Sequence, residues 1–194
     1  MNKEFVITVM SVDRAGIIRD VSRAVLDLEG NIGALSQTVM KGYFTIILTA
    51  SFDEKIEGEM VAEAIREMGR PGELGVQIKE RDPEVEAPVV EEAERFVLTV
   101  TGPDRKGIIQ RITSHLASRG VNIEDLYAVA EGDEFLLIAQ LEMPPGTETE
   151  RMQMEVQHLW PAAEVEVSLQ HENIFLATSN VDFRHVAPAR GDVR

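Results

Sequence analysis

The sequence predicts an α+β fold made of two consecutive βαββαβ units, each with an antiparallel four-stranded sheet and its helices on one face. Two observations support this prediction. Residues 5–52 align with residues 96–143 without a gap, at a constant offset of 91 (96 − 5 and 122 − 31). Within each copy, segments with the alternating pattern of strands are interleaved with segments that have helical apolar spacing. Coincident polar loop residues further indicate duplication of one unit with a shared loop chemistry.

The first copy shows its strands most clearly at 43–52. There, apolar and polar side chains alternate, and Phe44, Ile46, Leu48, Ala50 and Phe52 are predicted to face the core. A helix beginning at Ile17 is predicted to end at Gly30-Asn31, because glycine and asparagine favour helix C-termini. The remaining elements are strands at 4–12, 32–40 and 75–80, a turn at 41–42, and a helix through 61–68.

The second copy gives the same order of elements. Strands are predicted at 95–102, 122–130, 134–143 and 164–170, and helices at 107–119 and 147–160. Right-handed β-α-β crossovers then produce the ferredoxin-like arrangement. Residues His171–Asn180 are expected to prolong the last strand.

Four segments follow from this pattern: a first domain at 1–81, a linker at 82–94, a second domain at 95–171 and a C-terminal extension at 172–194. The linker is predicted to be semi-rigid and self-repelling, since it combines two prolines with several acids. Its acids are Asp82, Glu84, Glu86, Glu91, Glu92 and Glu94, and its prolines are Pro83 and Pro88.

The composition of the chain disfavours or excludes several classes of function. The 194 residues include 34 acidic and 19 basic ones, a formal net charge of −15, which disfavours direct binding to nucleic acid. No apolar run approaches the ~20 residues of a membrane span, and the N-terminus does not resemble a signal peptide. The absence of cysteine excludes disulfides and thiolate chemistry. A cytoplasmic protein without membrane contact is expected.

One polar signature recurs where the first strand of each copy meets its first helix. Asp13-Arg14-Ala15-Gly16-Ile17-Ile18 corresponds to Asp104-Arg105-Lys106-Gly107-Ile108-Ile109. Two interpretations are open. The aspartates cap the helix and the glycines, placed within its first turn, relieve a tight turn. Alternatively, the free N–H groups at the helix start bind a carboxylate, with glycine allowing a ligand to approach.

Catalytic and cofactor signatures are missing from the sequence. There is no phosphate-binding loop between the first strand and helix, no Cys-x-x-Cys, no P-loop and no paired histidines. RNA-recognition modules need exposed aromatics where this chain has Thr8, Thr45 and Thr49. His115 is expected to be a partly buried surface residue. We therefore predict no enzymatic activity, no catalytic residue, no metal and no cofactor.

The signature Asp-Arg-x-Gly-Ile-Ile, followed about fifteen residues later by Asn-Ile and then a hairpin, resembles an ACT domain. Two copies in tandem resemble the glycine cleavage system transcriptional repressor family, over roughly residues 3–170. The resemblance implies a non-enzymatic sensor that binds an amino acid and acts by changing a contact with a protein such as a transcription factor. Glycine and serine are suggested as ligands by the family's role alone.

The resemblance also implies a ligand site between two domains, formed by the first loop of one and the segment entering the second strand of its neighbour. The residues implied are Asp13, Arg14, Ala15, Gly16, Ile17 and Asn31, and Asp104, Arg105, Lys106, Gly107, Ile108 and Asn122. The asparagines have a second interpretation, helix C-capping with positive φ. Because Gly33-Ala34 becomes Glu124-Asp125 and Val12 becomes Pro103, the second repeat is a candidate to bind alone.

Two other functions stay open. The folds could serve only for dimerisation or interaction, with the loops as helix caps, or the chain could be a phosphatase-like enzyme. Exposed sheet edges favour either side-by-side packing of the two units or a homodimer.

Overall fold

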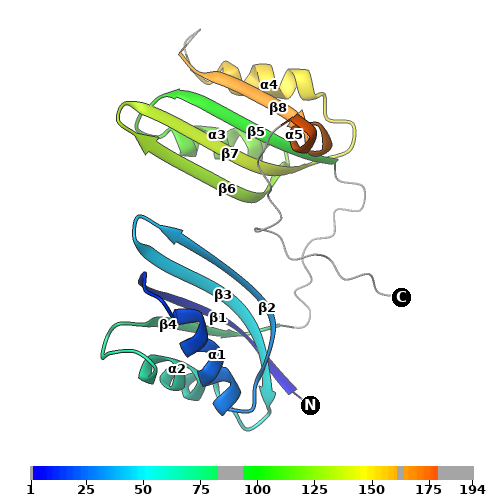
Figure 1. The fold of residues 1–194 in the computed structure, drawn as a ribbon. Coiled ribbons are helices and arrows are strands. Elements are labelled where there is room, and N and C mark those ends of the chain that lie inside the picture. The colour runs from blue at the N-terminus through cyan, green and yellow to red at the C-terminus, as the bar shows by residue number, and fades with distance from the viewer. Residues whose placement is uncertain (1, 83–93, 161–163, 179–194) are drawn as a thin grey trace. The chain divides into compact units, whose positions relative to one another are not determined.

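The computed structural model describes residues 2–82, 94–160 and 164–178, which form two compact units. The first unit has the predicted order of elements (Figure 1). Its strands form one antiparallel sheet in the order β2-β3-β1-β4. The elements are β1 (Asn2–Val12), α1 (Ile17–Asp27), β2 (Asn31–Met40), β3 (Tyr43–Asp53), α2 (Gly58–Glu67) and β4 (Gly75–Glu80).

The second unit repeats this topology, with sheet order β6-β7-β5-β8. The prediction of two ferredoxin-like βαββαβ units is therefore confirmed. The offset of 91 also extends beyond the stretch that reveals the repeat, because Gly75 starts β4 and Glu166 starts β8. The elements are β5 (Glu94–Pro103), α3 (Ile108–Ser118), β6 (Asn122–Glu131), β7 (Glu134–Met143), α4 (Thr149–Gln157) and β8 (Glu166–His171).

Each unit has its own apolar core between the sheet and its two helices. The alternating residues of β3 behave as predicted, and all five of its core-facing side chains are buried. Helix α1 adds Ile17, Val21 and Val25 from one face, the 3–4 residue spacing expected of an amphipathic helix. Within the described part of the chain, no helix is long and apolar enough to cross a bilayer.

The segment after the second repeat corrects one prediction. Residues 172–178 do not prolong β8 but form a short helix, α5 (Glu172–Thr178), which contacts β5 and β8. The rest of the extension (179–194) and most of the acidic linker (83–93) lie outside the described residues. The boundaries 1–81, 82–94, 95–171 and 172–194 therefore stay proposals.

The first helix of each unit ends in the same hydrogen-bonded turn. The N–H of Gly30 donates to the carbonyl of Val25 at 2.9 Å, and the N–H of Val121 donates to that of Leu116 at 3.1 Å. This is the Schellman pattern, which needs a residue with positive φ just before the donor. That residue is Glu29 (φ 58°) in the first unit and Gly120 (φ 69°) in the second.

The predicted C-capping role of the asparagines is therefore wrong. Asn31 and Asn122 are the first residues of β2 and β6, and neither has a positive φ. The first helix ends at Asp27, three residues before Gly30, and the left-handed residue, Glu29, lies two positions before Asn31.

Glu29→Gly is expected to stabilise the protein by about 1 kcal/mol, since a side chain in the left-handed region is strained and glycine is not. The matched control is Gly120→Ala, whose new Cβ would lie 3.8 Å from Pro144, an ordinary contact. It should lose a similar amount through backbone strain alone. Urea unfolding measures both changes, and a loss of stability in Glu29→Gly would contradict the assignment.

Candidate functional site

The loops that carry the repeated signature have the same backbone in both units. Gly16 (φ 92°) and Gly107 (φ 83°) are the N-cap residues of α1 and α3, both in the left-handed region. The glycine thus precedes the first turn rather than lying in it, and its conformation explains why glycine occupies this position. The backbone N–H of Asp13 donates to Gly42 at 2.9 Å, and that of Asp104 donates to Asp133 at 2.8 Å.

The predicted capping role of the two aspartates is wrong. Neither helix has a side-chain hydrogen bond at its N-cap. Asp13 and Asp104 are instead exposed on the loop, three residues before the glycine. The first-turn N–H groups of α1 and α3 therefore have no side-chain acceptor among the described residues, which removes one argument against anion binding at this position.

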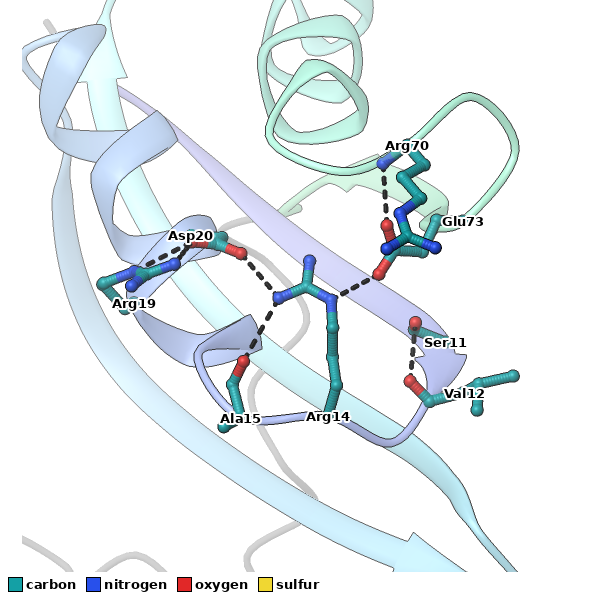
Figure 2. Close-up of polar contacts among 8 residues, drawn as sticks. All are labelled: Ser11, Val12, Arg14, Ala15, Arg19, Asp20, Arg70 and Glu73. Carbon is teal, nitrogen blue, oxygen red and sulfur yellow. Dashed lines mark hydrogen bonds and ion pairs between the residues drawn. The ribbon is translucent and has the colours of Figure 1, made fainter.

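In the first unit, Arg14 lies at the centre of an ion-pair network (Figure 2). Its Nη1 donates to Oδ2 of Asp20 at 2.8 Å, and its Nε donates to Oε1 of Glu73. Arg19 donates to Oδ1 of Asp20 through Nε at 3.0 Å and Nη2 at 2.7 Å. The backbone N–H of Arg70 holds the other oxygen of Glu73 at 2.7 Å. The network thus ties the loop to both α1 and the connection between α2 and β4.

The carboxylates of this network are held in their charged form. Hydrogen bonds from Arg19 and then Arg14 lower the pKa of Asp20, which is only 9% exposed. The N–H of Arg70, followed by Arg14, lowers the pKa of Glu73. A carboxylate with a lowered pKa in the folded state stabilises the fold above its ordinary pKa and loses that effect as the pH falls.

Glu73→Gln should therefore be less stable than the parent protein at pH 7, and this difference should shrink as the pH falls below about 4.3, the ordinary pKa of glutamate. Glutamine keeps an oxygen for the N–H of Arg70 but loses the charge that pairs with Arg14. Thermal melting from pH 7 to pH 3 measures the difference. Glu63→Gln, at an exposed position of α2, is the control and should change the melting temperature less at pH 7. A difference for Glu73→Gln that is independent of pH would contradict the role assigned to its charge.

The second unit keeps one half of this network. Nη2 of Arg105 lies 2.8 Å from Oε2 of Glu164. Both residues are 91 positions after Arg14 and Glu73, so the same Arg–Glu pair joins the loop to the same connection in each unit. The other half is absent, because Arg111 stands where the first unit has Asp20.

A hollow of about 610 Å³ lies beside the loop of the second unit. Asp104, Arg105, Gly107 and Ile108 line one side, together with Thr113 and the exposed Ile109 on α3. The other side includes β6, where small side chains leave space. The β6 residues of the lining are Ala128, Val129 and Ala130.

The loop of the first unit borders a hollow of about 620 Å³. Asp13 and Arg14 line it, but so do the network partners Arg19, Asp20 and Glu73. A larger hollow of about 940 Å³ in the second unit faces several carboxylates, among them Glu131, Glu134, Glu164 and Glu166.

The predicted asparagines lie far from the loop of their own unit. Asn122 begins β6, whereas the loop adjoins Ala128–Ala130 near the end of that strand. At ~3.3 Å per residue, the six to eight residues between them span about 20–26 Å. Asn31 occupies the same position in β2, opposite Ser51. Within a single unit, the predicted loop residues and the asparagine therefore do not form one site.

The other predicted residues differ in what they offer a ligand. Ala15 and Lys106 are exposed on their loops. Ile17 and Ile108 are buried and belong to the apolar cores, so only their backbone could face a ligand.

Three acidic residues that contact the loop arginines were not predicted from the sequence: Glu73, Glu164 and Asp20. The offset of 91 contained a signal for the first two, since it aligns Glu73 with Glu164. A fourth missed residue is Glu142, which is 8% exposed and accepts a hydrogen bond from Nδ2 of Asn122 at 3.1 Å.

The described residues give little support for a metal site or for a functional histidine. No group of three or more His, Asp or Glu side chains there could hold a metal ion. His115 is partly buried, as expected, and its Nε2 lies 3.3 Å from Oε2 of Glu155. Arg119, just after α3, and Arg151, on α4, pair with Glu155, so this carboxylate joins the end of α3 to α4.

Known proteins resemble this chain in sequence. The family model described as "ACT domain" matches residues 94–170. A UPF0237 protein of Methanosarcina acetivorans is 37% identical over 82 residues, which is 42% of this chain and 89% of that protein. A UPF0237 protein of Corynebacterium diphtheriae is 49% identical over 49 residues, 25% of this chain and 55% of that protein.

Solved structures share the fold over most of the chain. A protein of unknown function from Galdieria sulphuraria matches with a TM-score of 0.69 and 22% identity, over 88% of this chain and 99% of that one. A protein assigned as a glycine cleavage system transcriptional repressor matches with a TM-score of 0.62 and 22% identity, over 88% and 97%. At this identity the likeness concerns the fold. The sequence relatives, together with the ACT-domain match, show that the chain belongs to the UPF0237 family of ACT-domain proteins.

Proposed function

We propose that this protein is a non-enzymatic regulatory protein that binds an amino acid and signals through contact with another protein. The observation that supports this most is the loop of the second unit. It combines a helix start without a side-chain cap, a left-handed glycine and an adjacent hollow of about 610 Å³. That volume lies within the range of small-molecule sites.

The groups around this loop suit the two charges of an amino acid. First-turn N–H groups of α3, with Arg105 and Lys106 close by in the chain, would attract the α-carboxylate. The exposed carboxylate of Asp104 lines the same hollow and would accept the α-ammonium. Asn122 would contribute from the second unit of another copy of the chain, since the family resemblance implies a site between two domains. Glycine and serine are the first ligands to test.

The net charge of −15 supports a protein partner, such as a transcription factor, rather than direct contact with nucleic acid. In this proposal the protein works in the cytoplasm, without a cofactor, and a homodimer is one arrangement that would bring two domains together.

An interaction module without a ligand is the second candidate. It is favoured by apolar side chains on the helix-free face of the first sheet, each half or more exposed. Val12, Tyr43 and Met40 are cross-strand neighbours there, beside Met10 and Ile47. Apolar residues grouped in this way often mark a protein contact.

Thermal melting against each standard amino acid at millimolar concentration tests the proposal. A ligand at ~100 times its Kd adds about 2.7 kcal/mol. For a chain of this size we expect a rise of roughly 5–10 °C for one or a few related amino acids. Asp104→Asn should reduce the rise, and Glu63→Gln, an exposed acid on α2 of the first unit, should not. A flat panel would favour the interaction module.

A further inference from the structure

We infer that each chain binds one amino acid molecule, in the second repeat, and that the first repeat binds none. In the first repeat, the carboxylates of Asp20 and Glu73 already occupy Arg14, the arginine of the loop. This inference rests on the proposed function and specifies which of its two loops is the site.

The carboxylate of Asp20 already has the partners that a bound carboxylate would need. It lies on the first turns of α1, where the helix start favours negative charge. Arg14 binds one of its oxygens and Arg19 binds the other through two nitrogens, and Figure 2 shows the side chain between the two guanidinium groups. A ligand carboxylate arriving here would have to displace a buried, internally paired one.

Arg14 is further restrained from the other side. Its Nε donates to Glu73, which is itself held by the N–H of Arg70. The two carboxylates on Arg14 come from different parts of the unit, Asp20 from α1 and Glu73 from the connection between α2 and β4. Arg14 therefore positions the loop and has little capacity left for a ligand.

The second repeat lacks the internal carboxylate. Arg111 replaces Asp20, and Gln110 replaces Arg19. Among the described residues, Arg105 pairs with one acid, Glu164, and its side chain is 48% exposed, compared with 32% for Arg14. Arg105 can therefore turn toward a ligand at a smaller cost than Arg14.

The charges at matched positions around the two loops also favour binding in the second repeat. In the first repeat, the bases Arg14, Arg19 and Arg70 stand against the acids Asp13, Asp20 and Glu73, so the charges balance. In the second repeat, the matched positions hold one more base than acid. They are Arg105, Lys106 and Arg111 against Asp104 and Glu164. Only the second loop has an excess of positive charge with which to attract a carboxylate.

Equilibrium dialysis with a radiolabelled mixture of the standard amino acids tests the inference, because it counts the molecules bound per chain at saturation. The expected result is one. Arg111→Asp gives the second loop the carboxylate that the first loop has, and it should weaken binding at least tenfold. Position 111 is exposed, so this variant should fold. Glu63→Gln is the control for a surface change and should bind like the parent protein.

The outcomes separate the two proposals. Two molecules per chain, or one molecule whose binding Arg111→Asp leaves unchanged, would overturn the inference and leave the proposed function standing. No bound amino acid at any concentration tested would overturn both.

Discussion

Gly30→Val is expected to destabilise the first unit by roughly 3 kcal/mol, the upper end of the usual cost of overpacking a core. A Cβ at position 30 would lie 2.3 Å from Cε1 of Phe52 and 2.6 Å from its Cδ1. Phe52 is buried in the core of the unit, so its ring has little room to move. Urea unfolding followed by far-UV circular dichroism measures the loss.

The second unit shows how the clash should be relieved. Val121 and Met143 occupy the positions equivalent to Gly30 and Phe52, so a larger side chain at one position accompanies a slimmer, more flexible one at the other. The double variant Gly30→Val with Phe52→Met should therefore recover at least 1 kcal/mol relative to the sum of the two single changes, a coupling of the size seen between contacting residues. Strictly additive effects would show that the two positions do not share this space.

Leu98→Ala is expected to cost about 2–5 kcal/mol, the range for removing a fully buried leucine side chain. Leu98 lies in β5, one of the two inner strands, between Ala139 of β7 and Leu169 of β8, and has no exposed surface. The fluorescence of Trp160, the only tryptophan in the sequence, reports on the same core during urea unfolding.

Thr99→Ala is the control for Leu98→Ala. Thr99 follows it on β5, so its side chain lies on the opposite face of the sheet, where it is partly exposed. Its loss should cost well under half as much. Equal effects at the two positions would contradict the assignment of the core to one face of the sheet.

The repeat and the alternation of residues 43–52 were sufficient to predict the sheets, because burial on one face leaves a pattern of period two in the sequence. The end of the chain gave no such pattern. Residues 172–178 follow β8 directly and include Ile174, Phe175 and Leu176, which suit a strand or a short helix. Contact with β5 and β8 accompanies the helical form, and a local pattern cannot show such contact.

The chemistry of the loops was only partly predictable. The positions of Gly16 and Gly107 followed from the repeated signature, and both glycines adopt the conformation that only glycine takes easily. The pairing of Arg14 with Glu73 did not follow, because 59 residues separate them along the chain. Left-handed Glu29 was also missed, since glutamate is an unfavourable residue there and Asn31 is a better one by propensity alone.

The central claim, that the second repeat binds an amino acid through its loop, is tested most directly by nuclear magnetic resonance of the ¹⁵N-labelled protein. Titration with the amino acids that raise the melting temperature, or with glycine and serine if none does, should move the backbone amide signals of residues 104–109 and leave those of residues 13–18 in place. Movement at the first loop alone would contradict the choice of repeat. Signals that stay fixed in both loops at millimolar ligand would contradict the claim that this protein is an amino-acid sensor.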